Sequence, residues 1–547
     1  MEADLTTAPE WARETWALDR RRYLLAHALT PVLLALGIWY LVWRTPTVAG
    51  TGILGYVFYA AEVFTFASVV LTTGLMLRIR VRDGAPSPPR GTLDVFVTVC
   101  GEPSAMVEKT LVAALAIDYP HKTYLLNDCF IAKQENDREI KQLAERLGVP
   151  CFTRRIGVRK KAGNLNNGLR RTHGDFVAVI DADHIAVPHF ADHTLGYFEQ
   201  EDLALVATPQ RVVDGTIDPL NNQEPFFYRS LMLAKDASNA TFSCGNAVIY
   251  RRSALESIGG FSEWNLVEDV HTSYRLHQQG WRTAYHPYAI TTGTSPTTAA
   301  EYTKQRLRWT TDNFRTFLFQ NPLWRRGLKI RQRLHYFHTT GFPIFNCLQI
   351  LFLICPVLFL IWRVPVMRFV AMSGYGIHTL PYMCVLGLVM TLYAGRGAGV
   401  RNLGAAVAFA PTGVLGMLQA LTGRRVPTGV TRKDREARFT PAAIPQYCLW
   451  LIALLGVVWA AVVRPPGAVG AGLWCAWSLY ALTPFVAAVT PDKRRTRVVR
   501  RGTQLAVAGL AATLFVPAAL QTNIRHAPVS TTDRRAQPAS FEPDARR

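Results

Sequence analysis

Regularly spaced cysteines are missing from this chain of 547 residues. Its nine cysteines are odd in number and scattered along the sequence, and no two of them form a C-x-x-C pair. This pattern argues against a disulfide framework and against a zinc site, and it is typical of a globular part in a reducing compartment. The chain also has no internal repeats.

Acidic residues are few beside basic ones, 39 against 60, so the formal net charge is +21. Such a charge can indicate nucleic-acid binding. Here, however, the basic clusters at 20–22, 78–82 and 493–501 each flank an apolar run. Lys and Arg in these places keep loops on the cytoplasmic side and favour anionic lipid headgroups. We therefore predict contact with a lipid membrane and no nucleic-acid partner.

Long apolar runs are absent between residues 92 and 333 and occur on both sides of that region. The runs at 24–42 and 53–77 are each long enough to cross a hydrocarbon layer of ~30 Å. Five more runs lie at 336–361, 375–393, 446–463, 468–489 and 504–520. We predict seven spans, and we interpret the first as an uncleaved anchor because its apolar core is too long for a signal peptide.

The apolar block at 403–421 differs from these spans. Pro411 and several glycines interrupt it, and polar, basic sequence follows it at 424–440. We predict an interfacial helix along the cytoplasmic surface, followed by a loop. The predicted domains are 1–91 (cytoplasmic segment, two spans and linker), 92–335 (cytoplasmic catalytic domain), 336–521 (transmembrane channel region) and 522–547 (disordered tail). The side of the tail depends on whether 504–520 spans.

Short β-rich runs alternate with helical stretches in the region between the spans. We expect strands at 93–99, 124–127 and 175–181, and helices at 104–117 and 136–147. Alternation at this spacing predicts an α/β domain with a largely parallel sheet. In such sheets, ligands bind at the carboxyl ends of the strands.

The strand at 175–181 ends in Asp181-Ala182-Asp183. Alternate residues of a strand point the same way, so both carboxylates face one side. Such a pair can hold Mg²⁺ or Mn²⁺, which bridges diphosphate oxygens and stabilises a departing nucleotide. Most D-x-D sequences are solvated turns, and the residues alone leave both interpretations open.

A second acidic pair, Glu268 and Asp269, follows a Gly-Gly-Phe turn at 259–261. A carboxylate here could be the general base that takes a proton from an acceptor hydroxyl as it attacks a sugar's anomeric carbon. The alternative is an acidic pair stabilised by the dipole of a helix that begins at this point. Considered in isolation, the pair favours the second interpretation.

On a helix, Gln305, Arg308 and Trp309 fall on one face. They offer an amide for hydroxyls, a guanidinium for phosphate and a ring on which a sugar can rest. An amphipathic interfacial helix is the alternative, because Trp and Arg both favour that position.

Two basic loops contain further candidate residues. Lys161 lies in the K-K-A-G-N run at 160–164, where it could approach a diphosphate or belong to solvated surface. Thr431 and Lys433 lie in the polar loop after the interfacial block and could close over a diphosphate.

These five motifs, in this order, resemble the catalytic subunit of bacterial cellulose synthase and related processive family-2 glycosyltransferases. The resemblance covers residues 93–489. Matching segments are G-E-P at 101–103 (N-E-P in the family), K-A-G-N at 161–164, D-A-D-H at 181–184, C-G at 244–245, V-E-D at 267–269 (usually T-E-D), Q-R-L-R-W at 305–309 and V-T-R-K at 430–433.

The resemblance implies an α/β domain of the GT-A type inserted in a helical transmembrane bundle. It implies inverting transfer of glucose from UDP-glucose to a growing β-glucan, with a β-1,4 linkage expected, at the plasma membrane with Mg²⁺ or Mn²⁺. It also implies these site residues: Asp269 as base with Glu268 beside it; Asp181 and Asp183 for metal; Glu102, Asn127, Asp128, Lys161, Asp181, Arg308, Thr431 and Lys433 for the donor; Trp309, Gln305, Cys244 and Gly245 for the acceptor.

Some positions depart from the family pattern. Asn127-Asp128-Cys129 stands where D-D-G is usual, and either Asn127 or Asp128 could meet the base. Thr428 replaces a Phe of the gating loop. The sequence after the last spans leaves no room for a cyclic di-GMP-binding barrel, so we interpret Arg497 and Arg501 as topological charges. Accessory export or modification subunits are further expected partners.

Three alternatives remain open. The first changes the donor to UDP-N-acetylglucosamine or GDP-mannose. The second is a non-processive membrane transferase with a lipid acceptor, against which the gating loop and Q-x-x-R-W argue. The third is a glycan exporter without catalysis, against which the intact acidic motifs argue.

Overall fold

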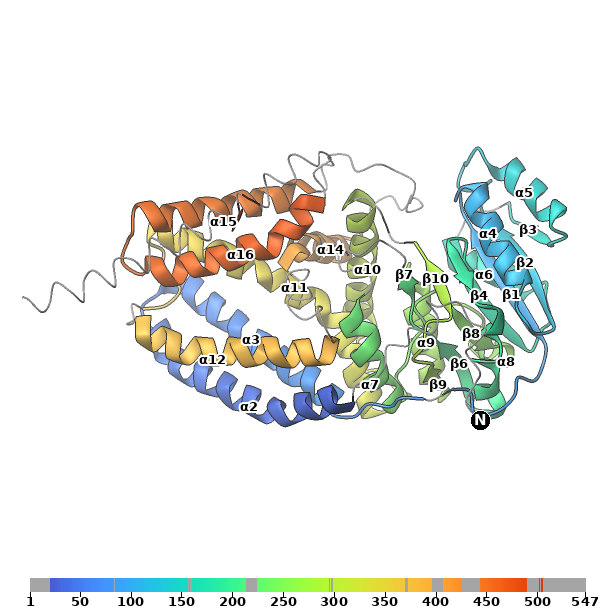
Figure 1. Ribbon diagram of the computed structural model, residues 1–547, viewed down its shortest axis with the longest axis horizontal. Helices are drawn as coiled ribbons and strands as arrows, with labels where there is room; N and C mark the ends of the chain where they lie inside the picture. Colours follow the sequence, from blue (N-terminus) through green and yellow to red (C-terminus); the bar gives the residue numbers. More distant parts are fainter. Residues whose placement is uncertain are drawn as a thin grey trace, which may run out of the picture.

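A computed structural model describes residues 20–82, 84–155, 157, 160–212, 224–294, 296, 299–368, 372–395, 407–424, 443–488, 501, 503 and 504. Figure 1 shows two parts along the longest axis, a bundle of long helices at one end and a sheet domain at the other. One helix, α10 (Ala299–Phe319), stands between them.

The sheet domain is built on seven strands in the order β3-β2-β1-β4-β8-β6-β9. Their bounds are β1 Leu93–Val99, β2 His121–Asn127, β3 Cys151–Thr153, β4 Phe176–Asp181, β6 Leu203–Ala207, β8 Val248–Arg251 and β9 Arg282–Tyr285. Strands β3, β2, β1 and β4 are parallel, whereas β8 runs antiparallel to both of its neighbours. The predicted α/β domain with a largely parallel sheet is confirmed, with β8 as the exception.

Helices cover both faces of this sheet, which is why its central strands are mostly apolar. All seven residues of β1 are buried. Since side chains alternate across a strand, Val95, Val97 and Val99 join one core cluster and Phe96 joins the other. The helices that follow the first strands are α4 (Ser104–Leu115), α5 (Asp137–Arg146) and α6 (Lys160–Leu169).

A smaller sheet adds β5 (His184–Ala186), β10 (Thr291–Gly293) and β7 (Arg211–Val212), in the order β5-β10-β7. It begins three residues after the end of β4. The remaining helices of the domain are the short α7 (Met232–Ala237) and α8 (Arg252–Ser257), and α9 (Glu268–Gln278).

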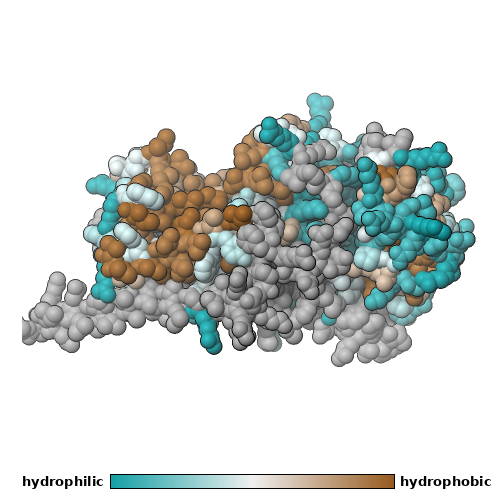
Figure 2. All heavy atoms as spheres, turned by 90° about the horizontal axis from the view of Figure 1, so that it is seen from above, coloured by the Kyte–Doolittle hydropathy of each residue, from teal (hydrophilic) through white to brown (hydrophobic). Residues whose placement is uncertain are grey.

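Six helices are long and apolar enough to cross a membrane in the described part of the chain. They are α2 (Arg20–Arg44), α3 (Gly52–Met76), α11 (Ile330–Trp362), α12 (Met372–Ala394), α15 (Ile444–Val462) and α16 (Ala468–Ala488). In Figure 2 apolar residues cover this end of the molecule and hydrophilic ones the sheet domain. Six of the seven predicted spans thus appear as helices, and the seventh, at 504–520, lies outside the described residues from 505 onward.

The block predicted as an interfacial helix forms α14 (Ala410–Thr422), with Pro411 in its first turn, where a missing N–H costs nothing. At ~1.5 Å per residue its 13 residues cover ~20 Å, which is short for a span. It packs on α10 and α11, and Thr311 donates a hydrogen bond to Gln419. Its position along a membrane surface stays a prediction.

A buried charge pair joins the first two helices. Arg44 is 1% exposed, and its Nε lies 3.0 Å from Glu62 Oε2, while Tyr40 donates a hydrogen bond of 2.5 Å to the other carboxylate oxygen. Arg44 also donates to the carbonyl of Val366, after α11. This network fixes α2, α3 and the segment between α11 and α12 to one another at one end of the bundle.

Lys235, on α7, is buried at 1% exposure where the sheet domain meets α11. Its Nζ donates to the carbonyl oxygen of His335 at 3.3 Å and to Thr339 Oγ1 at 2.8 Å, and it lies 5.0 Å from the Phe242 ring centroid. Within the described part of the chain Lys235 forms no ion pair. Burial therefore lowers the pKa of Lys235 to about 7.

We predict that Lys235→Met raises thermal stability in detergent. The folded-state pKa of Lys235 lies below the usual lysine value, so between about pH 7 and pH 10.5 the unfolded chain binds a proton that the folded chain lacks. Wild-type stability should therefore rise with pH in that window, and the gain from Met should be largest near pH 7 and shrink above it. A variant less stable than wild type at pH 7 would contradict this reasoning.

Candidate active site

Three parallel strands end side by side at one edge of the main sheet. Strand register pairs Val99 of β1 with Asn127 of β2, and Thr98 of β1 with Asp181 of β4. Two of the predicted motifs, G-E-P and D-A-D-H, therefore start at neighbouring strand ends. The third, at 127–129, follows β2 beside them. This arrangement is the one that the sequence predicted for a ligand edge.

Lys161 links three of the predicted motifs. It comes from the first turn of α6, and its Nζ donates to Asp181 Oδ1 at 2.5 Å and to the carbonyl oxygen of Gly245 at 2.6 Å. Asp181 is further held by Thr98 Oγ1, and its backbone N–H donates to Asn246 Oδ1. The carboxylates of Asp181, Glu268 and Asp269 together raise the pKa of Lys161, although burial lowers it, so this lysine is a cation.

Asp269, in the first turn of α9, lies on the other side of Gly245. A Cβ built on Gly245, whose φ is +81°, would lie 3.0 Å from Asp269 Oδ2 and 3.6 Å from Lys161 Nζ. Burial, and then the neighbouring charge of Glu268, raise the pKa of Asp269 to about 7. The N–H of Val270 and the charges of Lys161 and Arg308 oppose that shift. Catalytic acids and bases often have a pKa shifted in this way.

Hydrogen bonds attach the loop that contributes Gly245 to α9. Ser243 N donates to Ser273 Oγ at 2.9 Å, and Ser273 Oγ in turn donates to the carbonyl oxygen of Asp269 at 2.8 Å. Gly245 N donates to Ser243 Oγ at 3.0 Å. These bonds hold the predicted acceptor residues Cys244 and Gly245 in fixed register with the predicted base.

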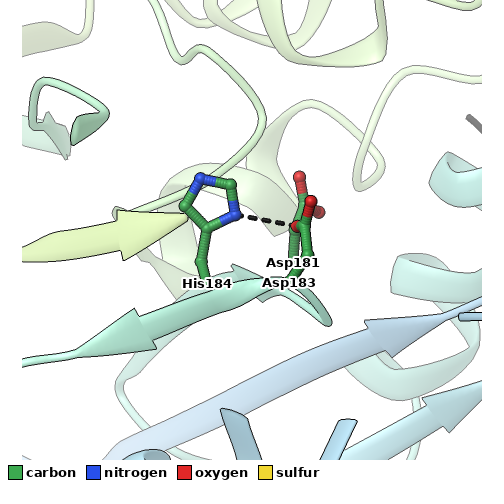
Figure 3. A group of neighbouring side chains, drawn as sticks. All are labelled: Asp181, Asp183 and His184. Carbon is green, nitrogen blue, oxygen red and sulfur yellow. Dashed lines mark hydrogen bonds and ion pairs between the residues drawn. The ribbon is translucent and has the colours of Figure 1, made fainter. Parts of the chain in front are cut away.

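Asp181, Asp183 and His184 offer ligand atoms that all lie within 4.8 Å of one another (Figure 3). His184 Nδ1 lies 2.8 Å from Asp183 Oδ1, and burial lowers the pKa of His184 to about 4, so its ring is neutral. Two carboxylates and a neutral imidazole are donors that suit Mn²⁺, and the carboxylates suit Mg²⁺. The residues therefore fit a divalent metal. The sequence prediction named only the two aspartates.

The predicted donor residues at the ends of β1 and β2 are held by local bonds. Glu102 Oε2 accepts from the N–H of Cys100 at 2.6 Å. Asn127 donates from Nδ2 to Asp137 Oδ1 and accepts at Oδ1 from the N–H of Cys129. Asp128 accepts two bonds from Arg154, at 2.7 and 2.6 Å. All three predicted residues lie at the predicted edge.

Helix α10 brings the third motif to the same region. Arg308 lies close enough to Asp269 for its charge to act on that carboxyl. Trp309 and Gln305 are half-buried on the same helix. Thr431 and Lys433 lie outside the described residues. The roles of all these residues remain predictions.

Comparisons with known proteins agree with this geometry. Residues 88–311 match the family described as glycosyltransferase like family 2, and residues 258–400 match the cellulose synthase family. Residues 88–311 therefore resemble a family-2 glycosyltransferase domain. This match and the strand order confirm the predicted GT-A-type fold between helices long and apolar enough to span a membrane, and they agree with the predicted enzyme class.

Several relatives of this chain are named cellulose synthase catalytic subunit (UDP-forming). The one from Xanthomonas axonopodis pv. citri is 33% identical over 325 residues, which are 55% of this chain and 44% of that protein. Cellulose synthase 1 catalytic subunit from Komagataeibacter xylinus is 29% identical over 392 residues, 67% of this chain and 51% of that protein. The chain thus spans about half the length of the relatives it matches.

A solved mannosyltransferase from Pyrobaculum calidifontis, in complex with GDP-mannose and Mn²⁺, is 17% identical with a TM-score of 0.48. The likeness covers 68% of this chain and all of that one.

Sequence reasoning missed several residues of the candidate site. No role was predicted for His184 of D-A-D-H, although its position next to Asp183 could have indicated a metal ligand. Asn246 and Ser273 act through hydrogen bonds to Asp181 and to the acceptor loop. Arg154 lies beyond the five motifs, and nothing in its sequence context indicated its bonds to Asp128.

We predict that Gly245→Ala reduces glycosyl transfer by up to about 100-fold, because the new methyl group displaces the Asp269 carboxylate by a few tenths of an ångström. Gly259→Ala is the matched control. Its φ is +76°, so it carries a similar backbone cost, but a Cβ there meets nothing within 4 Å. Thermal unfolding should therefore respond alike in both variants, and only Gly245→Ala should lose activity. Equal activity in the two variants would show that the active site does not depend on Gly245.

Proposed function

We propose that this chain is a processive, inverting glycosyltransferase that polymerises glucose from UDP-glucose into a β-glucan, with β-1,4 linkage, and moves it across the plasma membrane. The observation that carries the proposal is the convergence of Lys161, Asp181 and Asp269 around Gly245. The names of the relatives support the donor, the product and the processive character.

In this proposal Asp269 removes the proton from an acceptor hydroxyl while that oxygen attacks the anomeric carbon of the donor sugar. The bond from that carbon to the diphosphate oxygen breaks on the opposite face, the nucleotide leaves with the electron pair, and configuration inverts. A base with a pKa of about 7 suits this task, since about half of it is ionised near neutral pH and the ionised form readily accepts a proton. Lys161 and Arg308 supply positive charge beside the departing diphosphate.

We assign the divalent ion to Asp181, Asp183 and His184, as Mg²⁺ or Mn²⁺. When bound, such an ion neutralises charge on the diphosphate. Before it binds, Lys161 offsets the charge of Asp181, so the protein's own residues keep the carboxylates in place. Turnover that survives removal of divalent ions by a chelator would exclude this assignment.

The membrane part of the proposal places the sheet domain in the cytoplasm, because Arg20, Arg21 and Arg22 precede the first span. The predicted domain bounds, the seventh span and the interfacial position of α14 belong to this proposal. So do the gating roles of Thr431 and Lys433, the seat of the terminal sugar on Trp309, a channel through residues 336–521, and accessory export or modification subunits.

We predict that membranes containing the wild-type chain incorporate glucose from labelled UDP-glucose into a polymer, and that Asp269→Asn abolishes incorporation because an amide cannot take up the proton. Sizing and digestion with a β-1,4-specific glucanase would identify the product. Thermal unfolding of Asp269→Asn should match wild type or exceed it, because the substitution removes a buried like-charge pair.

The same assay separates the alternatives. Better incorporation from UDP-N-acetylglucosamine or GDP-mannose would show that glucose is not the preferred sugar, while the chain would still be a polymerase. A product with one added sugar on a lipid would indicate the non-processive transferase. Full export function in Asp269→Asn would indicate a transporter without catalysis.

We predict that activity falls as the pH drops below about 7, because protonation of Asp269 removes the base. Glu268→Gln takes away the neighbouring charge that contributes to the raised pKa, while burial remains. The acidic limb of the rate profile should therefore move to lower pH in that variant. An unchanged limb would show that another group sets the pH dependence.

A further inference from the structure

Arg306 is the one charged residue of the Q-R-L-R-W run for which the proposed function has no role. It lies on α10 with its side chain 16% exposed, and it forms an ion pair with Glu224, which is 21% exposed. A charge pair this far removed from water is costly to break, so it holds α10 firmly to the segment before α7.

Three aromatic rings surround the Arg306 guanidinium. Its central carbon lies 4.7 Å from the ring centroid of Trp309, 4.9 Å from that of Tyr302 and 5.3 Å from that of Phe409. Tyr302 and Trp309 precede and follow Arg306 by four and three residues, so they share its face of α10. Phe409 comes from the N-terminal end of α14, and its ring centroid lies 5.2 Å from that of Tyr302.

Glu224 connects this cluster to the catalytic corner. Burial, and then the carboxylates of Asp269 and Glu224, raise the pKa of the Cys244 thiol, so both carboxylates lie near Cys244. Arg306 therefore bridges Trp309 and Glu224, and the charge of Glu224 acts on Cys244 in the loop beside Asp269. Since the guanidinium occupies one face of the indole, the other face is the one that a sugar can contact.

We propose that Arg306 is a positioning residue of the acceptor site: it holds the Trp309 indole by a cation–π contact and, through Glu224, fixes that ring relative to the catalytic carboxylate. The inference deepens the proposed function and rests on the role of Trp309 as the seat of the acceptor's terminal sugar. A stacked guanidinium is better suited to this than an ammonium, because its planar, weakly hydrated group lies flat on the ring.

Arg315, on the same helix, provides a matched control. Its guanidinium carbon lies 5.8 Å from the Trp264 ring centroid and 6.0 Å from that of Phe319, and its Nε is 3.7 Å from Asp312 Oδ1. It thus resembles Arg306 in residue type, helix and kind of contact, and it does not contact Trp309. If Arg306→Met acted only by destabilising the fold, Arg315→Met should have a similar effect.

The test measures the KM for a soluble glucan oligosaccharide acceptor and for UDP-glucose in Arg306→Met, Arg306→Lys, Glu224→Gln and Arg315→Met. We expect Arg306→Met and Glu224→Gln to raise the acceptor KM about three- to thirtyfold, with the donor KM unchanged. Arg306→Lys should recover part of the loss. Arg315→Met should leave the acceptor KM at the wild-type value. Glu224→Gln keeps shape and size, so it tests the inference even if Arg306→Met fails to fold.

A double mutant shows whether Arg306 acts through Trp309. In a Trp309→Ala background, with acceptor binding measured directly, Arg306→Met should add little, because the ring it positions is gone. Additive losses, a changed donor KM with an unchanged acceptor KM, or an equal effect of Arg315→Met would each overturn the inference. If wild type makes no polymer, the proposed function fails; if it polymerises and the Arg306 variants match it, only this inference fails.

Discussion

The site depends on the contact between Lys161 Nζ, Asp181 and the carbonyl oxygen of Gly245. One ammonium group joins the end of β4, the start of α6 and the loop before β8, which are otherwise far apart along the chain. Its charge also opposes the rise in the pKa of Asp269 that burial and Glu268 produce. Without this cation, carboxylates at 181, 268 and 269 would face one another in a poorly solvated corner.

The same corner is tied to the membrane helices by α10. Its middle turns hold the predicted acceptor residues, its outer face packs on α14 through Thr311 and Gln419, and it also packs on α11. Arg306 adds a charge pair and a stack of rings to this junction. The junction of α10 with α14 and α11 thus connects the helix that carries Gln305, Arg308 and Trp309 to the bundle.

Much of the fold could be predicted because it depends on local pattern. The run 93–99 became β1 with the same bounds, since a short, mostly apolar, β-branched segment suits a strand buried on both faces. The antiparallel β8 could not be predicted, because its direction is set by pairing with β4 and β6, far away in sequence. The Arg44–Glu62 ion pair and the contacts of Lys235 could not be predicted either. The sequence shows a charge in or beside an apolar helix, but not which group that charge will meet.

The departure from the family pattern at 127–129 is consistent with its surroundings. Asn127 must donate to the Asp137 carboxylate and accept from the N–H of Cys129 at once, which an amide does and a carboxylate does not. An aspartate at 127 would face Asp137 with like charge. The second carboxylate of the family pattern is kept as Asp128, where two bonds from Arg154 neutralise its charge. The edge of the sheet thus keeps one carboxylate, paired with Arg154, beside an amide that is hydrogen-bonded on both sides.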